Sequence, residues 1–336
     1  MTVRVAINGF GRIGRLVLRS IAEHARRDIE VVAINDLGPV ETNAHLFRYD
    51  SVHGRFPGVV TSGEDWIDVG MGKIRVTAIR DPKYLPHKEL GVDIAFECTG
   101  IFTSKEKASA HLAAGAKRVL VSAPADGADK TIVHKVNCDT LTADDIIVSN
   151  GSCTTNALAP VAKVLNDLFG IERGYMTTIH SYTGDQPTLD TMHKDLYRAR
   201  AAALNMIPTS TGAAKAVGLG LPALKGKLDG SSIRVPTPNV SVVDLKFIPG
   251  RDTSKDEINA AIKAAAESGP LKGILAVTEE PLVSGDFNHN PASSTVALNQ
   301  TQVIDGKLAR VLSWYDNEWG FATRMSDTAM AMAKFL

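Results

Sequence analysis

The sequence predicts an α/β protein of two domains, the first built on a mostly parallel, doubly wound sheet. Three observations support this prediction. Short apolar, β-branched runs alternate with segments of helical apolar spacing through the first half of the chain. A glycine-rich turn joins the first apolar run to the first helical segment. The length of 336 residues exceeds what a single hydrophobic core usually supports.

The strands and helices of the first half follow one another in regular order. Strands are predicted over Val3–Asn8, Val31–Asn35, Val92–Cys98, Arg118–Ser122 and Ile146–Val148. Helical spacing follows the first strand and recurs over Lys105–Ala114. Units of strand, helix and strand connect in a right-handed sense and pair their strands in parallel, so one parallel sheet is expected here.

The turn after the first strand carries the spacing of a dinucleotide-binding motif, with Gly9, Gly11 and Gly14 between strand and helix. Gly9 permits the tight turn, Gly11 lets the backbone approach a pyrophosphate, and Gly14 allows close helix packing. Asp36 ends the second strand, 22 positions after Gly14. Its carboxylate suits a ribose diol and repels a 2′-phosphate, which predicts NAD rather than NADP. The alternative interpretation is a glycine turn and a strand-end aspartate without a dinucleotide.

The second half opens with a thiol at the predicted start of a helix. Ser152 is a good N-cap, and the apolar spacing beyond Cys153 is helical. The positive end of the helix dipole is expected to lower the pKa of the Cys153 thiol, which makes this residue the candidate nucleophile. His180 ends a strand-like run and precedes a polar loop, so it is the candidate base.

A buried structural role is the alternative for each cysteine, because free cysteine is among the most buried residue types. Cys98 lies inside an apolar strand and Cys138 in a short mixed segment, so both are interpreted as packing residues. The polar, helix-opening surroundings set Cys153 apart. No histidine pair has metal-ligand spacing on a helix, so no metal is expected.

Two further segments have the composition of anion sites. Ile207–Lys215 is rich in hydroxyl side chains and is predicted as a loop that runs into a helix. Arg234 ends a strand before a proline-rich stretch, and arginine suits bidentate phosphate binding. Hydroxyl residues also cap many helices and most arginines lie on the surface, so each segment has an ordinary structural interpretation as well.

Composition limits the partners and the compartment. The formal net charge is zero, which removes the electrostatic footprint of a nucleic-acid-binding protein. No apolar run approaches the roughly 18 residues that span a bilayer, and the N-terminal residues enter a strand pattern without a signal sequence. Three scattered cysteines form neither a disulfide framework nor a metal motif. A cytoplasmic protein without nucleic-acid or membrane partners is expected.

Longer motifs give the chain a family resemblance. They are Ile7–Arg15, Ser152–Asn156, His180–Thr183, Arg234–Ser241 and Trp314–Gly320. On these motifs the chain resembles, almost from end to end, the phosphorylating NAD-dependent glyceraldehyde-3-phosphate dehydrogenases of bacterial type. The resemblance implies a homotetramer and a Rossmann-type NAD-binding domain over residues 1–150, completed by a C-terminal helix over 318–336. It also implies an α+β catalytic domain with a largely antiparallel sheet over 151–317.

The resemblance further implies roles for individual residues. Cys153 is then the nucleophile and His180 its base. The cofactor-contacting positions are Gly9, Gly11, Arg12, Ile13, Gly14, Asp36, Arg80, Ser122 and Asn317. The positions that bind substrate or inorganic phosphate are Ser152, Thr154, Thr183, Arg198, Thr211, Gly212 and Arg234.

The implied reaction is the NAD-dependent oxidation of D-glyceraldehyde 3-phosphate to 1,3-bisphosphoglycerate, through a hemithioacetal and then a thioester on Cys153. Inorganic phosphate resolves the thioester. Three alternatives stay open at this point: a related erythrose-4-phosphate dehydrogenase, a thiol acyl-transferase or hydrolase that uses Cys153 and His180 without redox chemistry, and a dinucleotide-binding regulatory partner. The glycine motif and Asp36 argue against the second alternative.

The chain departs from the family pattern at a few positions. Gly151 stands where alanine usually precedes the Ser–Cys pair, and Gly184 replaces an asparagine. Tyr197 replaces an arginine that often precedes Arg198. Thr191–Met192 replaces a Leu–Pro pair associated with the exclusion of NADP, which weakens the expected preference for NAD.

Overall fold

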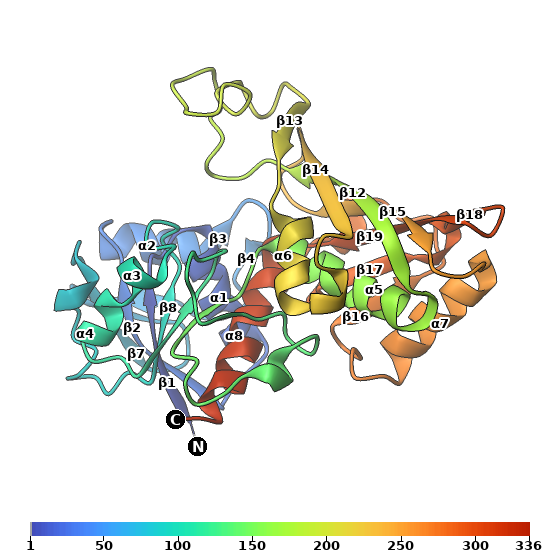
Figure 1. The fold of residues 1–336 in the computed structure, drawn as a ribbon. Helices are drawn as coiled ribbons and strands as arrows, with labels where there is room; N and C mark the ends of the chain where they lie inside the picture. Colours follow the sequence, from blue (N-terminus) through green and yellow to red (C-terminus); the bar gives the residue numbers. More distant parts are fainter. Residues whose placement is uncertain (1) are drawn as a thin grey trace. The chain divides into compact units, whose positions relative to one another are not determined.

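The computed structural model describes residues 2–336, which form two compact units (Figure 1). The first unit comprises the chain up to Ile132 together with Cys138–Gly151 and Ala322–Leu336. The second unit comprises Val133–Asn137 and Ser152–Phe321. Each unit has its own large sheet and its own buried apolar clusters.

A nine-stranded sheet organises the first unit. Its strands are β1 Val3–Asn8, β2 Ile29–Asn35, β5 Thr61–Ser62, β6 Trp66–Asp68, β7 Lys73–Thr77, β8 Ile94–Glu97, β9 Arg118–Val121, β10 Lys130–Thr131 and β11 Ile147–Ser149. The helices and the separate hairpin are α1 Arg12–Glu23, α2 Val40–Arg48, α3 Lys105–Ala108, α4 Ala110–Ala113, β3 Tyr49–Asp50 and β4 Gly54–Arg55. In the order β10-β11-β9-β8-β1-β2-β7-β6-β5, the strands pair in parallel except at the β6 and β5 edge. The predicted mostly parallel sheet is confirmed.

The central strands of this sheet are apolar along their whole length because both of their faces are covered. Every residue of β8 is buried, and so is each residue of β1 except Arg4. On α1, Leu16, Val17 and Ile21 are buried at helical spacing, which places the apolar stripe of the helix against the protein interior. Continuous apolar runs predict the strands of this region, and the apolar stripe predicts its first helix.

The glycine turn fixes how closely α1 approaches the end of β1. A Cβ atom on Gly14 would lie 2.0 Å from the carbonyl oxygen of Gly9, so no side chain fits there. Gly9 itself has a φ of +90°, a backbone conformation that favours glycine. A Cβ atom on Gly11, in contrast, would meet no protein atom within 4 Å. The packing role expected of Gly14 and the open backbone expected at Gly11 are both present.

An eight-stranded sheet and three helices make up most of the second unit. The elements are α5 Cys153–Phe169, β12 Ile171–Ser181, β13 Ile207–Ser210, α6 Ala213–Gly220, β14 Leu228–Val235, β15 Ser241–Pro249, α7 Lys255–Glu267, β16 Leu275–Thr278, β17 Ser294–Ala297, β18 Gln302–Ile304 and β19 Leu308–Tyr315. The strand order is β13-β14-β12-β15-β19-β17-β16, with β18 beside β19. Only β12–β14 and β16–β17 are parallel pairs. The predicted α+β unit with a largely antiparallel sheet is confirmed.

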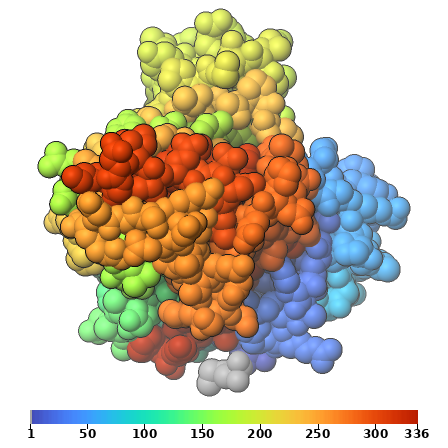
Figure 2. All heavy atoms as spheres, turned by 90° about the vertical axis from the view of Figure 1, so that its right-hand side faces the viewer, coloured from blue at the N-terminus to red at the C-terminus, as the bar shows by residue number. Residues whose placement is uncertain are grey.

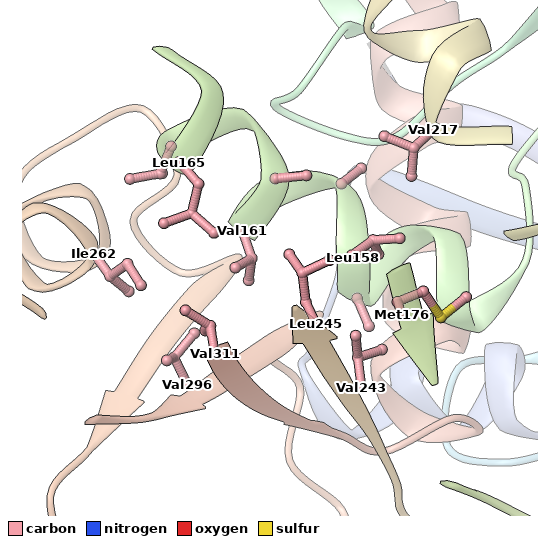
Figure 3. Packing of buried hydrophobic residues seen from close by; sticks show 14 of the residues in the cluster. Leu158, Val161, Leu165, Met176, Val217, Val243, Leu245, Ile262, Val296 and Val311 are labelled. Carbon is pink, nitrogen blue, oxygen red and sulfur yellow. The ribbon is translucent and has the colours of Figure 1, made fainter. Parts of the chain in front are cut away.

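Helix α5 packs across the inner face of this sheet (Figure 3). Leu158, Val161 and Leu165 on the helix belong to one buried apolar cluster with Leu245 of β15 and Val311 of β19. A cluster of this kind gains stability from the apolar area that it removes from water. The packing therefore holds the first turn of α5, which carries Cys153, in a fixed place over the sheet.

The last helix, α8 Trp319–Ala333, is tied to the first unit along its C-terminal part. The hydroxyl groups of Thr323 and Ser20 lie 3.1 Å apart, and the Thr328 hydroxyl donates to Asn150 Oδ1 at 2.7 Å. Asp327 forms an ion pair with Arg26 at 2.9 Å. These contacts join the C-terminal segment to α1 and to the end of β11.

Two local predictions are wrong. The single helix expected over Lys105–Ala114 is two short helices, α3 and α4, because the hydroxyl of Ser109 donates to the carbonyl of Glu106 at 2.6 Å. The loop expected over Ile207–Lys215 begins as strand β13, because its backbone pairs antiparallel with β14, with Ile207 opposite Arg234. Its second half enters α6 as predicted.

The close contact at Gly14 predicts a contrast between two alanine variants. Gly14→Ala should lower the free energy of unfolding by at least about 2 kcal/mol, since the new methyl group meets a backbone oxygen that cannot turn away. Gly11→Ala should leave stability within about 0.5 kcal/mol, because the added atom has no neighbour. Urea unfolding of both variants measures the difference, and equal stabilities would contradict it.

Candidate active site

Cys153 lies in the first turn of α5, where its thiol meets the positive end of a long helix. Ser152 is the N-cap, and its hydroxyl accepts a hydrogen bond from the amide of Thr155 at 3.0 Å. The predicted N-cap is confirmed. Because the cap fixes the first turn, the Cys153 side chain points from a rigid element and not from a loop.

His180 lies opposite the thiol, near the end of β12. Its Nε2 is 3.4 Å from Cys153 Sγ, and its Nδ1 is 2.7 Å from the carbonyl oxygen of Ser181. A carbonyl oxygen only accepts hydrogen bonds, so Nδ1 carries a hydrogen and Nε2 is the atom that exchanges a proton with the thiol. The two residues that the sequence singled out are therefore brought together in a reactive orientation.

Burial disfavours a lone charge on either member of this pair. It raises the pKa of the Cys153 thiol, although Arg234 and Thr154 act in the opposite direction. It lowers the pKa of His180 to about 3, with Arg234 acting in the same direction. The pair therefore keeps one proton between Sγ and Nε2 and no net charge. The lowered thiol pKa expected from the helix end alone is not found, because desolvation outweighs the favourable charges.

Ser181 connects the pair to the rest of the site. Its carbonyl oxygen also accepts from Arg234 Nη1 at 3.1 Å, and its hydroxyl donates to Asn317 Oδ1 at 2.9 Å. The Ser181 amide donates to Ser241 Oγ at 3.1 Å, and that hydroxyl donates to the same Asn317 oxygen at 2.8 Å. Asn317, expected at a cofactor-contacting position, is thus buried in the second unit. Two hydroxyl groups donate to its Oδ1, which fixes the orientation of its side-chain amide.

Tyr315 is part of the site, although sequence reasoning did not single it out. Its hydroxyl lies 2.9 Å from Thr154 Oγ1 and 2.8 Å from Thr178 Oγ1. Its ring meets the His180 ring edge-on, with 6.0 Å between the ring centres. Burial raises the pKa of the Tyr315 hydroxyl, so it remains a neutral partner that holds the imidazole and the first turn of α5 together. The motif around Trp314 was the available signal.

A cluster of two arginines and two polar side chains borders the pair. Arg234 Nη1 donates to Thr183 Oγ1 at 2.7 Å, and Arg198 Nη1 donates to Asp185 Oδ2 at 2.8 Å. The Thr183 hydroxyl donates to the other oxygen of Asp185. Burial and the nearby Arg198 lower the pKa of Arg234, and its buried Nε has no partner among residues 2–336. Two cations in one cluster make this a favourable place for an anion.

The remaining predicted substrate positions lie at helix starts. Thr211 Oγ1 accepts from the amide of Ala213 at 3.2 Å, and Gly212 is the N-cap of α6 with no side-chain hydrogen bond to fill that place. The hydroxyls of Ser152 and Thr154 are engaged with Thr155 and Tyr315, respectively. Their expected contacts with substrate or phosphate stay predictions.

A separate pocket of about 440 Å³ lies in the first unit, at the carboxyl ends of β1, β2, β7 and β8. Gly9, Gly11, Asp36 and Arg80 are among its lining residues. Asp36 accepts from the amides of Phe10 at 2.9 Å and Gly38 at 2.8 Å. The start of α1 has no side-chain cap, and the backbone amides of a helix start suit a pyrophosphate. An open glycine, uncapped amides and a strand-end carboxylate fit a dinucleotide.

Three further expected cofactor positions are Arg12, Ile13 and Ser122, and two of them have contacts within the described chain. The Arg12 guanidinium lies 2.5 Å from Asp50. Burial would raise the pKa of Asp50, but Arg12 and two backbone amides outweigh it and lower that pKa to about 2. Ile13 lies in the first turn of α1, and Ser122 follows β9 with its amide donating to the Glu97 carbonyl at 2.9 Å.

Residues 2–336 contain no helix long and apolar enough to cross a bilayer. Over the same range, no three His, Cys, Asp or Glu side chains lie close enough together to hold a metal ion. Cys98 is one of the residues that line the pocket of the first unit, and burial raises the pKa of its thiol.

Two family models match the chain. Residues 3–105 match the glyceraldehyde 3-phosphate dehydrogenase NAD binding domain, and residues 152–317 match the C-terminal domain of the same family. A curated relative from Xanthobacter flavus, named glyceraldehyde-3-phosphate dehydrogenase, is 76% identical over 334 residues, which cover 99% of each chain. The chain belongs to the glyceraldehyde 3-phosphate dehydrogenase family.

Relatives with the same name cover the full length in other bacteria as well. That of Cereibacter sphaeroides is 74% identical over 100% of each chain. That of Geobacillus stearothermophilus is 57% identical over 99% of each chain. The predicted family, the α/β fold class and NAD as the cofactor are confirmed.

The shared proton predicts how the thiol responds to loss of its partner. His180→Asn removes the proton acceptor, and burial then keeps the pKa of Cys153 above its ordinary value of 9.0. Alkylation of Cys153 by iodoacetamide at pH 7 should fall at least about tenfold and recover as the pH rises. Peptide mass spectrometry measures the rate, with His45→Asn on α2 as the control. Equal rates in both variants would remove His180 from thiol activation.

Proposed function

We propose that this chain oxidises D-glyceraldehyde 3-phosphate to 1,3-bisphosphoglycerate with NAD and inorganic phosphate, the reaction that serves glycolysis and gluconeogenesis. The observation that carries the proposal is the 3.4 Å approach of Cys153 Sγ to His180 Nε2 beside the arginine cluster. A thiol at a helix start with its own base suits covalent attack on an aldehyde. The adjacent cations suit a substrate that carries a phosphate.

In the first step Cys153 is the nucleophile. Its thiol proton passes to His180 Nε2 while sulfur forms a bond to the aldehyde carbon. His180 then donates this proton to the former carbonyl oxygen, which gives a hemithioacetal and returns the imidazole to its neutral form. The net charge of the pair does not change during this transfer, so burial does not oppose it. Thr183 and Arg234 then hold the phosphate of the substrate, since they already form one hydrogen-bonded group.

In the second step His180 removes the proton from the hemithioacetal hydroxyl. NAD, when bound, accepts the hydride that leaves the same carbon. The carbon–oxygen double bond reforms and leaves a thioester on Cys153. The hydrogen bond from Nδ1 to the Ser181 carbonyl keeps the imidazole oriented and stabilises its protonated form.

Inorganic phosphate completes the reaction. Its oxygen attacks the thioester carbon, the carbon–sulfur bond breaks, and an acyl phosphate leaves while Cys153 regains the shared proton. The groups proposed to hold the attacking ion are Arg198, Thr211 and Gly212, together with Ser152 and Thr154, which flank Cys153 in the chain. Arg198 is already oriented by Thr209 at 3.0 Å and by Asp185.

The first unit supplies the NAD site, with Gly9, Gly11, Gly14, Asp36 and Arg80 as its proposed contacts. Arg12, Ile13 and Ser122 in the first unit and Asn317 in the second are further proposed contacts. The domain roles follow: residues 1–150 and 318–336 for the cofactor, and residues 151–317 for catalysis.

A homotetramer in the cytoplasm is the proposed state. An apolar arm, residues 186–206 between β12 and β13, projects from the second unit at the top of Figure 2. Met192 is 96% exposed, and Leu189, Leu196, Leu204 and Met206 are exposed with it. Exposed apolar side chains gathered in this way usually mark an interface. They suit burial against further copies of the chain.

Light scattering after size exclusion tests the assembly. The unchanged chain should have the mass of a tetramer, and Met192→Glu should shift the population toward smaller species, because a charge replaces an apolar contact. Ile304→Glu, on β18 outside the arm, is the control with no expected change. A monomeric unchanged chain would contradict the proposal.

The covalent route predicts a dependence on phosphate. With glyceraldehyde 3-phosphate, NAD and phosphate, reduced-nicotinamide absorbance should rise steadily; without phosphate it should stop after one equivalent per site. Cys153→Ser should lose turnover by at least about a thousandfold and keep NAD binding, because serine has no comparable nucleophilicity beside a neutral imidazole. Turnover that ignores phosphate would indicate hydrolysis. Higher kcat/KM with erythrose 4-phosphate would indicate the related dehydrogenase.

A further inference from the structure

A row of polar side chains closes the carboxyl ends of four neighbouring parallel strands in the first unit. Glu97 of β8 pairs in register with Asn8 of β1, which pairs with Asn35 of β2, which pairs with Thr77 of β7. Asn8 Nδ2 donates to Glu97 Oε2 at 2.7 Å, and Asn35 Nδ2 donates to Asn8 Oδ1 at 2.8 Å. Thr77 Oγ1 donates to Asn35 Oδ1 at 2.8 Å. The reaction described above assigns no part to this row.

Glu97 determines how the side-chain amides of the row are oriented. Its carboxylate is 1% exposed and accepts four hydrogen bonds, none of them from lysine or arginine. The donors are Asn8 Nδ2, His111 Nε2, and both the amide and the hydroxyl of Thr99. Four donors satisfy all the acceptor positions of a carboxylate and hold its charge in the interior. Each neighbouring amide must then present its nitrogen toward Glu97.

Two buried histidines continue the chain behind Glu97. His111 Nε2 is 2.9 Å from Glu97 Oε2, and His111 Nδ1 is 3.0 Å from His87 Nε2. His111 Nε2 donates to the carboxylate, so the other ring nitrogen, Nδ1, faces His87. Burial and the nearby His111 lower the pKa of His87 to about 4, which keeps this ring neutral near pH 7. The two rings therefore extend the row beyond Glu97 as far as His87.

The opposite end of the row holds the backbone of the dinucleotide pocket. Asn35 Oδ1 accepts from the Ile79 amide at 2.8 Å, and Asn35 Nδ2 donates to the Ile79 carbonyl at 2.8 Å. Thr99, which donates twice to Glu97, lines the pocket, as do Asn8, Asn35 and Ile79. The two loops of the pocket wall at Thr99 and Ile79 are therefore connected through one buried carboxylate.

We propose that Glu97 and His111 are positioning residues for the dinucleotide, acting through the loops at Thr99 and Ile79. This proposal rests on the assignment of the pocket to NAD. Glutamine at position 97 has one side-chain nitrogen in place of a carboxylate oxygen. In one orientation this nitrogen faces the donors of Asn8 and His111, and in the other it faces the Thr99 amide, so a donor meets a donor in both. The row would then break, and the loops would lose the arrangement that matches the ligand. The Cys153–His180 pair lies outside this network.

The test uses the full-length enzyme, with NAD affinity from calorimetry and steady-state kinetics for each variant. Glu97→Gln should weaken NAD binding at least about tenfold and raise KM for NAD by a similar factor. The kcat at saturating NAD and KM for the aldehyde should stay within about twofold. Asp145→Asn is the matched control, since this buried carboxylate of the same unit accepts from Thr142 and lies outside the row.

A second pair of variants separates positioning from simple loss of stability. His111→Leu removes the donor to Glu97, whereas His111→Gln keeps an amide donor there. NAD affinity should fall in the first and largely return in the second. A lower melting temperature with unchanged NAD affinity in Glu97→Gln, or equal affinity in both His111 variants, would overturn the proposal. If Glu97→Gln does not fold, the His111 pair decides.

Different results would contradict the proposed function and the positioning role of Glu97 and His111. An unchanged chain that does not bind NAD would remove the proposed function itself. An unchanged chain that binds NAD, together with variants that bind it equally well, would remove only the positioning role of Glu97 and His111.

Discussion

The hydrogen bond from His180 Nδ1 to the Ser181 carbonyl is the contact on which the proposed chemistry depends. It settles which imidazole nitrogen faces Cys153, so the direction of every later proton transfer follows from it. Ser181 also binds Arg234 through that carbonyl and Asn317 through its hydroxyl. Ser181, the last residue of β12, thus contacts the proposed base His180, the Arg234 guanidinium and the Asn317 amide oxygen.

Glu97 in the first unit is a buried charged side chain and Arg234 in the second a half-buried one. No lysine, arginine, aspartate or glutamate of residues 2–336 contacts either of them at hydrogen-bond distance, and their surroundings differ. In the first unit Glu97 accepts four hydrogen bonds in a fixed row, none of them from lysine or arginine. In the second unit Arg234 lies between Thr183, the Ser181 carbonyl and a second cation, Arg198, with one nitrogen left unsatisfied. The first arrangement is complete and rigid, as a scaffold should be. The second is incomplete, which suits a site that gains its final partner from substrate.

Features that depend on neighbouring residues in the chain could be predicted from the sequence. The glycine turn and the Ser152 cap are of this kind, because backbone sterics and a local hydrogen bond decide them. The contacts of Tyr315 with Thr154 and Thr178 join segments far apart in the chain, so no local pattern revealed them. The thiol pKa of Cys153 was misjudged for the same reason: the helix end is local, whereas burial comes from tertiary packing.

The side-chain amide of Asn35 donates to the Ile79 carbonyl and accepts from the Ile79 backbone N–H. It thus pairs with Ile79 as a strand residue would, beyond the point where β7 ends. The pocket therefore depends on the identity of one side-chain atom. Deamidation would replace the Asn35 nitrogen, which donates twice, with an oxygen facing the Asn8 oxygen and the Ile79 carbonyl. The exchange of this one atom would place an oxygen opposite two acceptors. The loop that carries Arg80 would then lose its contact with the end of β2, although the gene is unchanged.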